Sequence, residues 1–141
     1  MRILSVDLGD ARTGLAVCDA GERLASPVGT LFQRDREKLL SQVAEAVREQ
    51  RAELVVVGHP RNMDGSRGES ARRAEEFAAL LTERGLEVIL WDERMTTLSA
   101  IGFLNQTNTR GKKRKGVVDT VAAVIILQSY LDSRKNQPTG S

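Results

Sequence analysis

The chain has 141 residues, of which 40% are hydrophobic and 28% charged, and its formal net charge is +2. No apolar run approaches the roughly 20 residues needed to span a bilayer, and the single cysteine, Cys18, excludes an internal disulfide. The composition predicts a cytoplasmic globular protein with no membrane partner, in which Cys18 is buried as a small hydrophobe. One domain is expected over residues 1–135, with a frayed tail at 136–141.

Three strands are predicted at the N-terminal end, over residues 2–8, 13–19 and 23–31. Short turns that contain glycine separate these runs, which favours an antiparallel meander. Pro27 lies within the third run. Because proline cannot donate to a sheet ladder, this strand is expected at an edge of the sheet or at a bulge.

After residue 34 the pattern alternates between helices and strands. Asp35 is expected to cap a helix, and Ser66 to open another through a capping box with Glu69. The expected elements are a helix from residue 35, an apolar central strand at 54–58, a helix from 66 to Gly85, a strand at 86–91, a short helix from Thr96 or Thr97 to about Leu104, and a helix at 117–134. This order predicts an α/β protein with a mixed five-stranded sheet, in which parallel strands extend the meander and helices cover both faces.

Three acidic residues stand where burial of a carboxylate needs an explanation. Asp7 and Glu93 each end an apolar run, and Asp119 interrupts the apolar stretch of the last predicted helix. A buried carboxylate is costly without a cation, and three that converge would repel one another unless a divalent metal lay between them. The pattern points to magnesium-dependent phosphoryl transfer. Each acid also has an ordinary alternative: a turn cap for Asp7, a solvated surface acid for Glu93, and a helix-dipole or Lys115 partner for Asp119.

A basic run directly precedes the last predicted helix. It places five positive charges in six positions, and no acid follows before Asp119. A solvated loop and a phosphate-binding segment both fit such a run, and its place beside Asp119 favours phosphate. The positive residues are Arg110, Lys112, Lys113, Arg114 and Lys115.

The segment 58–66 connects the strand at 54–58 to a helix N-terminus, where backbone N–H groups favour anions. Arg61, Asn62 and Ser66 are candidates to contact phosphate or sugar, although a plain turn followed by a cap explains the same residues. His59 is the only histidine, and without a second histidine or a cysteine nearby a zinc site is not expected. The aromatic side chains of Phe77 and Trp91 are expected in the core.

Four segments of the chain form a recognisable set. They are D-L-G-D-A-R-T-G from Asp7, V-V-G-H-P-R-N-M-D-G-S from Val56, L-W-D-E-R-M-T-T from Leu90, and K-K-R-K-G-V-V-D-T-V-A-A-V-I-I-L-Q-S-Y-L-D from Lys112. In this order and spacing they resemble the YqgF/RuvX family, whose bacterial members are described as pre-16S rRNA nucleases or as Holliday junction resolvases. The resemblance covers nearly the whole chain.

The resemblance implies an RNase H-like fold and a metal-dependent endonuclease that cleaves phosphodiester bonds of nucleic acid. Asp7, Glu93 and Asp119 would be both catalytic and metal-binding, with two Mg²⁺ or Mn²⁺ ions as cofactors, Asp7 bridging them, and a product that carries a 5′ phosphate. Few aromatic residues are available, so base stacking is expected to contribute little. The nucleic acid would be held by Arg12, Arg61, Asn62, Ser66, Arg110, Lys112, Lys113, Arg114 and Lys115.

The resemblance favours structured RNA as substrate, with processing of the 5′ end of pre-16S rRNA on ribosomal precursor particles as the implied role, by a monomer or weak homodimer. Cleavage of branched DNA is the first alternative, and a non-catalytic RNA-binding ribosome-assembly factor is the second. An ATP-binding domain of the sugar-kinase and actin type is the third, but such proteins need two domains and this chain supplies one. The sequence departs from the family pattern at Asp10 and Thr13, where Thr and Ile or Val are common, and Asp10 and Asp64 are weak candidates for a fourth acid.

Overall fold

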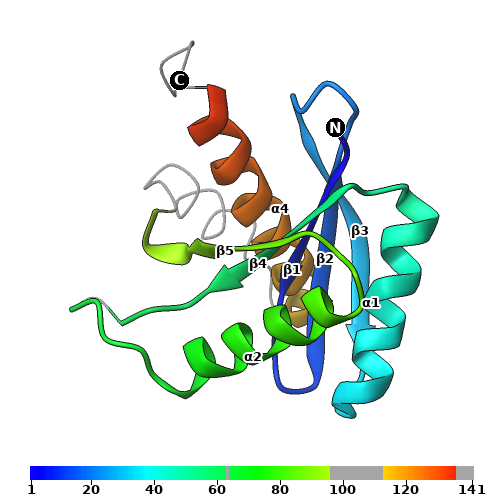
Figure 1. The fold of residues 1–141 in the computed structure, drawn as a ribbon. Helices are drawn as coiled ribbons and strands as arrows, with labels where there is room; N and C mark the ends of the chain where they lie inside the picture. Colours follow the sequence, from blue (N-terminus) through cyan, green and yellow to red (C-terminus); the bar gives the residue numbers. More distant parts are fainter. Residues whose placement is uncertain (63, 96–112, 136–141) are drawn as a thin grey trace.

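The computed structural model describes residues 1–62, 64–95 and 113–135, and for residues 113–120 it describes the backbone alone. Five strands form one mixed sheet in the order β3-β2-β1-β4-β5 (Figure 1). Helices α1 and α2 cover one face of the sheet and α4 covers the other. The predicted mixed five-stranded sheet with helices on both faces is therefore confirmed.

The first three strands form the predicted antiparallel meander, with β1 at Ile3–Asp7, β2 at Arg12–Cys18 and β3 at Ala25–Phe32. β3 is an edge strand, and its register against β2 shifts beside Pro27, so both expectations for this proline are confirmed. The turn between β1 and β2 needs glycine at position 9, because a Cβ atom there would lie 2.3 Å from the backbone oxygen of Arg12.

The next two strands run parallel to β1, with β4 at Leu54–His59 and β5 at Val88–Asp92. Helix α1 at Arg36–Gln50 leads from β3 to β4, and helix α2 at Glu69–Glu83 is the crossover between β4 and β5. Their apolar faces form a core with one side of the sheet that includes the predicted core residue Phe77, which is 1% exposed. Asp35 caps α1 as predicted, since its side chain accepts a hydrogen bond from the backbone N–H of Lys38.

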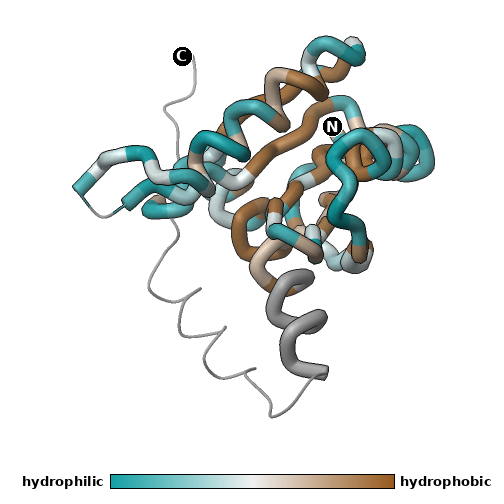
Figure 2. The backbone as a smooth tube through the Cα atoms, turned by 90° about the horizontal axis from the view of Figure 1, so that it is seen from below, coloured by the Kyte–Doolittle hydropathy of each residue, from teal (hydrophilic) through white to brown (hydrophobic). Residues whose placement is uncertain are grey.

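The long helix α4, at Lys113–Lys135, packs on the opposite side of the sheet and forms a second core cluster there. Cys18 belongs to this cluster and is buried, as expected for a small hydrophobe. Polar contacts also join the helix to the sheet: the buried hydroxyl of Ser5 donates to the backbone oxygen of Ala123 at 2.7 Å, and the side-chain oxygen of Gln128 accepts from the backbone N–H of Ala25 at 3.0 Å. In Figure 2 the hydrophobic stretches gather in the interior between these layers, and the hydrophilic turns lie at the periphery.

Two local predictions are wrong. Ser66 does not cap α2, whose cap position is Gly68 with no side-chain hydrogen bond, because the hydroxyl of Ser66 instead binds the nearby carboxylate of Asp64. The last helix starts at Lys113 rather than at 117, because lysine and arginine are good helix formers and need not form a loop. Glu93 directly follows β5, at the C-terminal end of the last parallel strand as predicted, and opens the 3-10 turn η1 at Glu93–Met95.

The remaining boundaries differ from the predicted ones by one or two residues. The predicted short helix from Thr96 or Thr97 to Leu104 lies outside the described residues. Within the described ranges, no helix is both long enough and apolar enough to cross a membrane.

Candidate active site

Asp7 is the last residue of β1 and points to the α4 face of the sheet. Side chains alternate along a strand, and the two preceding residues on the same side, Ile3 and Ser5, both contact the α4 layer. In the sheet, Asp7 pairs with Gly14 of β2, and the preceding residue, Val6, pairs with Val57 of β4. Asp7 therefore lies next to Gly58, at the carboxyl end of the parallel strands, where ligands bind in open α/β sheets.

Glu93 reaches the same place from β5. A Cβ atom at position 58 would lie 3.0 Å from Oε2 of Glu93 and 2.9 Å from Cδ1 of Ile126 in α4. The Glu93 carboxylate therefore packs over Gly58 on the α4 side, with Asp7 beside that glycine in the neighbouring strand. Only glycine at position 58 leaves room for this arrangement, and the apolar run that ends in Gly58 gave no sign of it.

The electrostatic environment of Glu93 is unusual for an acid. Burial raises the pKa of the Glu93 carboxyl above its ordinary value, the charge of His59 opposes this, and Asp92 adds to it. Among the described residues, the Glu93 side chain makes no hydrogen bond or ion pair that would compensate for its lost hydration. A desolvated carboxylate without a cation is the condition that a bound metal ion would relieve.

The third predicted acid, Asp119, lies in α4, but its side chain is outside the described part of the structure. No group of three histidine, cysteine or acidic side chains gathers to hold a metal among the side chains that are described. Asp7 and Glu93 are thus brought together on one face, and the structure leaves the contribution of Asp119 as a prediction.

The predicted nucleic-acid contacts in the first and second motifs lie around this site. Arg12 opens β2, and because it is two residues from Gly14 it lies on the same face as Asp7. Arg61 follows β4 and donates from Nη2 to the backbone oxygen of Gly65 at 2.6 Å. Asn62 donates to the hydroxyl of Ser66 at 2.9 Å, so these two exposed side chains are already ordered by the turn that contains them.

The basic run is described only in part. Arg110 and Lys112 lie outside the described residues, and Lys113, Arg114 and Lys115 form the first turn of α4 with their side chains not described. The run therefore continues into the helix instead of ending before it.

The two weak candidates for a fourth acid both have other partners. Asp10 forms an ion pair with Arg73 of α2. Asp64 accepts hydrogen bonds from the side chain and backbone of Ser66, which lower the pKa of its carboxyl. Neither carboxylate shows the unpaired, desolvated condition of Glu93.

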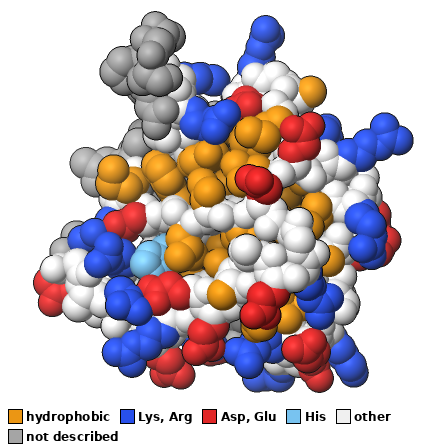
Figure 3. Space-filling view, viewed as in Figure 1, with side chains coloured by type: hydrophobic (Ala, Val, Ile, Leu, Met, Phe, Trp, Pro, Cys, Tyr) orange, Lys and Arg blue, Asp and Glu red, His pale blue; other side chains and the backbone are white. Residues whose placement is uncertain are grey.

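A cluster around His59 was not predicted. Nε2 of His59 lies 2.6 Å from the carboxylate of Glu75, and Arg67 binds the same carboxylate through two hydrogen bonds of 2.6 and 2.7 Å. Hydrogen bonds from Arg67 and then from His59 lower the pKa of Glu75 to about 2. The cluster ties the end of β4 and the segment before α2 to the second turn of α2, and Figure 3 shows the pale-blue histidine among acidic and basic side chains.

Buried polar atoms without a hydrogen-bond partner also collect at this end of the sheet. In the part of the chain that the structure describes, they are Thr13 Oγ1, Arg61 Nε and Trp91 Nε1. Thr13 precedes the partner of Asp7 in β2, Arg61 follows β4, and Trp91 lies two residues before Glu93. Such unpaired groups are costly and tend to mark functional sites.

The chain matches the model of the family described as "RuvX: Holliday junction resolvase" over residues 1–133. It belongs to the RuvX family. A relative from Anaeromyxobacter sp. (strain Fw109-5) is 44% identical over 135 residues, which are 95% of this chain and 98% of that protein, and one from Geobacillus sp. (strain WCH70) is 43% identical over 138 residues, 96% and 100%. Both carry the name "Putative pre-16S rRNA nuclease".

The chain also has a structural neighbour in RuvC of Thermus thermophilus, solved in complex with a Holliday junction substrate. The two chains share 16% sequence identity and a TM-score of 0.58, with 96% of this chain and 97% of RuvC covered. At this identity the likeness shows the fold alone, and it confirms the predicted RNase H-like fold.

Proposed function

We propose that this RuvX protein is a divalent-metal-dependent endonuclease that cleaves phosphodiester bonds of structured RNA, in processing of the 5′ end of pre-16S rRNA in the cytoplasm. The observation that carries the proposal is the placement of Asp7 and a desolvated, unpaired Glu93 around Gly58 at the carboxyl end of the parallel strands. The names of relatives with more than 40% identity over nearly the whole chain support the RNA substrate.

The residues fit a hard divalent cation. Mg²⁺ and Mn²⁺ prefer carboxylate oxygens, and the Glu93 side chain is desolvated and makes no hydrogen bond or ion pair among the described residues. The helix register supports Asp119 as the third ligand. Ala123 lies over Ser5, Asp119 comes one helical turn earlier, about 6 Å along α4, and Asp7 lies two residues beyond Ser5, about 7 Å along β1. The two backbones therefore progress by similar distances toward the same end of the sheet.

The proposed chemistry is of the two-metal type, and Asp7, Glu93 and Asp119 would hold the two ions. When bound, the ions lower the pKa of the attacking water and stabilise charge on the leaving 3′ oxygen, so the product carries a 5′ phosphate. Charge on the RNA backbone is neutralised, without reading of sequence, by Arg12, Arg61, Arg110, Lys112, Lys113, Arg114 and Lys115, while Asn62 and Ser66 donate hydrogen bonds.

The test is a cleavage assay with Mg²⁺ and with Mn²⁺, on a pre-16S rRNA fragment that spans the mature 5′ end. We expect Asp7→Asn to lower the rate on the order of 10³-fold or more, because the removed charge is a metal ligand. The matched control is Asp10→Asn, which removes an acid three residues away that is paired with Arg73 and should retain activity. Equal activity of Asp7→Asn and wild type would refute the proposal.

The family description favours a second substrate, a Holliday junction. A mobile four-way DNA junction run beside the RNA decides between the two. A resolvase must place two active sites on a two-fold axis, so symmetric cleavage of the junction together with a dimer in sedimentation equilibrium would support this alternative. Binding of RNA with no cleavage of either substrate would instead indicate a non-catalytic assembly factor.

A further inference from the structure

Phe32, the last residue of β3, is 71% exposed. The other aromatic side chains that the structure describes are packed: Phe77 is buried, and Trp91 and Tyr130 contact each other edge to face, with ring centroids 5.5 Å apart. A phenyl ring left in water forgoes the free energy that burial of its apolar surface would provide. Its exposure is therefore a feature that needs a function or a partner.

The sheet register places Phe32 on the face of the candidate active site. Asp7 pairs with Gly14, and Gly14 pairs in turn with Thr30 of β3, so these residues share one face. Two positions further along the same strands, Arg12 pairs with Phe32. Leu31, which lies between Thr30 and Phe32 in β3, packs on the other face of the sheet in the α1–α2 core, and this confirms the alternation of side chains.

The separation between Asp7 and Phe32 suits one nucleic acid that contacts both. Two strand spacings across the sheet and two residues along it give about 12 Å between the two Cα atoms. At 3.4 Å for each stacked nucleotide, this distance corresponds to about three or four nucleotides. A substrate whose phosphate lies at Asp7 therefore has a base within reach of Phe32.

The backbone next to Phe32 is held by a hydrogen bond, and a positively charged residue lies beside the ring. Directly after it, the backbone N–H of Gln33 donates to the backbone oxygen of Ala11 at 3.0 Å, which ties the end of β3 to the turn between β1 and β2. Arg12 pairs with Phe32 across the strands and supplies positive charge beside the ring. An aromatic face next to an arginine on a rigid strand is the usual arrangement for stacking of an unpaired base.

We propose that Phe32 stacks on an unpaired nucleobase of the substrate, within about four nucleotides of the bond cleaved at Asp7. This inference rests on the proposed function and narrows its substrate class to a bulge, loop or single strand beside the cleavage site, in place of an uninterrupted duplex. Bases within a duplex are stacked on their neighbours and offer no free face to the ring.

The test is a binding measurement that needs no cleavage. The probe is a 20-base-pair RNA duplex with one bulged 2-aminopurine, titrated in EDTA and again in Ca²⁺, beside the same duplex without the bulge. Wild type is expected to quench the 2-aminopurine fluorescence. Phe32→Leu, which keeps an apolar side chain but loses the ring, should abolish the quenching and weaken binding of the bulged RNA about 10-fold, while Phe32→Tyr should preserve both.

The matched control is Leu24→Ala, which removes another exposed apolar side chain (65% exposed) in the segment that precedes β3 and should bind like wild type. Affinity for the uninterrupted duplex should be the same in all variants. A bulged DNA duplex of the same sequence shows whether the stacked base must belong to RNA.

Three results would overturn the inference. If Phe32→Leu binds and quenches like wild type, the inference fails while the proposed nuclease function stands. If Phe32→Leu changes only the oligomeric state in sedimentation, Phe32 is a contact between copies of the chain. If wild type binds none of the nucleic acids, the proposed function fails together with the inference.

Discussion

Two glutamates lie against α4 near opposite ends of the sheet, and their surroundings differ. Burial raises the pKa of the Glu22 carboxyl, but hydrogen bonds and charges from the Met1 ammonium and Arg134 outweigh it and leave that pKa below its ordinary value. At the carboxyl end of the parallel strands, Glu93 is desolvated without such partners among the described residues, and its pKa is raised. The cost of desolvating a glutamate is therefore offset by cationic partners at Glu22 and is not offset by such partners at Glu93.

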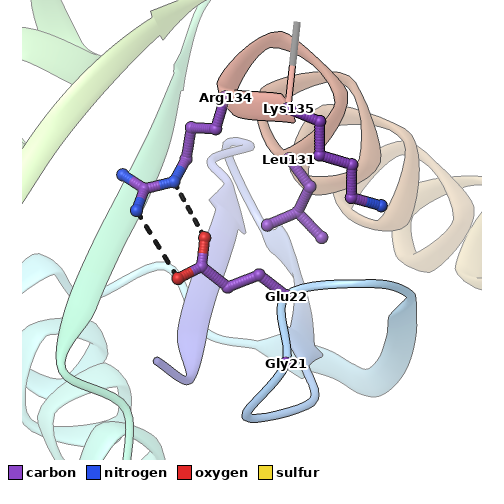
Figure 4. Close-up of a pocket in the computed structure, with 5 residues that line it drawn as sticks. All are labelled: Gly21, Glu22, Leu131, Arg134 and Lys135. Carbon is purple, nitrogen blue, oxygen red and sulfur yellow. Dashed lines mark hydrogen bonds and ion pairs between the residues drawn. The ribbon is translucent and has the colours of Figure 1, made fainter. Parts of the chain in front are cut away.

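At the end of the sheet near Glu22, side-chain contacts hold the C-terminal end of α4 in place. Arg134 binds Glu22 through Nε at 2.8 Å, donates to the hydroxyl of Tyr130 at 3.1 Å and lies over the Tyr130 ring. Arg134 and Glu22 line a cavity of about 350 Å³, and Figure 4 shows the hydrogen bonds between their side chains. By contrast, the buried polar atoms that lack a partner, as far as the structure describes the chain, all lie at the Asp7 end. The contrast indicates that stability is concentrated at one end and binding potential at the other.

The largest expected effect comes from Glu93→Gln. Loss of the carboxylate should lower metal-dependent cleavage on the order of 10³-fold, while removal of an uncompensated buried charge raises the free energy of unfolding of the metal-free protein by about 1 kcal/mol. Cleavage rates and urea unfolding in EDTA measure the two effects. Glu87→Gln, at an exposed residue just before β5, should change neither. A variant that loses stability as well as activity would show that Glu93 is a structural residue.

The raised pKa of Glu93 also predicts a pH effect. Only the ionised carboxylate binds a metal, so Mg²⁺ affinity should fall on acidification at a higher pH than an ordinary glutamate would cause. Isothermal titration with Mg²⁺ across a pH series measures this dependence. Affinity that stays constant down to the ordinary glutamate pKa would contradict the desolvated environment of Glu93.

Gly58→Ala should act on the same site through packing. The added Cβ would meet Cδ1 of Ile126 at 2.9 Å and Oε2 of Glu93 at 3.0 Å, so we expect a loss of about 1–3 kcal/mol in unfolding free energy together with weaker Mg²⁺ binding. Gly21→Ala is the control near the opposite end, because a Cβ there meets its nearest atom at an ordinary 3.6 Å. Chemical denaturation separates the two variants. Equal stability of both would contradict the close packing of Glu93 over Gly58.

Thr13→Val should stabilise the protein by about 1 kcal/mol. The Thr13 hydroxyl is fully buried and has no hydrogen-bond partner among the described residues, so its replacement by a methyl group removes a desolvation cost. Ser5→Ala is the contrasting variant, since that hydroxyl is bonded to Ala123 and its loss should destabilise. Urea midpoints with unchanged m-values give the sign of the stability change for each variant. A destabilised Thr13→Val would show that the hydroxyl has a partner.

The smallest effect is expected for Glu22→Gln. The folded pKa of Glu22 is depressed, so its contribution is present above the ordinary glutamate pKa and is lost as pH falls through the folded value. The substitution should cost less than about 1 kcal/mol at neutral pH and nothing at the acid end of the titration. Glu45→Gln, in an exposed pair with Arg48, is the control. A cost for Glu22→Gln that is independent of pH would exclude the ion pair as its cause.

The order of the elements along the chain and the placement of Asp7 and Glu93 at the ends of strands were predictable because they depend on local patterns. The run that ends in Asp7, the continuous apolar strand before Gly58 and the edge position of Pro27 each follow from a few adjacent residues. The convergence of Asp7, Gly58 and Glu93 depends on the pairing of β1 with β4 and of β4 with β5, which are far apart in the sequence. A single sequence does not specify the register of these pairings. The predicted cap at Ser66 failed for a related reason, because Asp64 competes for the same hydroxyl.

Side-chain environments were the least predictable part of the site. The exposure of Phe32 follows from the alternation of β3 beyond its bulge, and the sequence alone suggested only that few aromatics were available for stacking. His59 was considered only as a zinc ligand, because its partners Glu75 and Arg67 come from the segment and helix that follow β4. Gly58 has no side chain, and it matters because Glu93 and Ile126 occupy the space that a side chain would fill.

The hydrogen bond from Ser5 holds α4 at Ala123, which is closer along the helix to Asp119 than the contacts at Gln128 and Arg134 are. A tilt of the helix by about 5° around Ala123 displaces the backbone at Asp119, four residues away, by about 0.5 Å, which is the precision that catalytic groups require. The same tilt around the anchor at Arg134, fifteen residues away, displaces it by about 2 Å. The contact at Ser5 therefore limits the movement of the backbone at Asp119 more closely than the contact at Arg134 does.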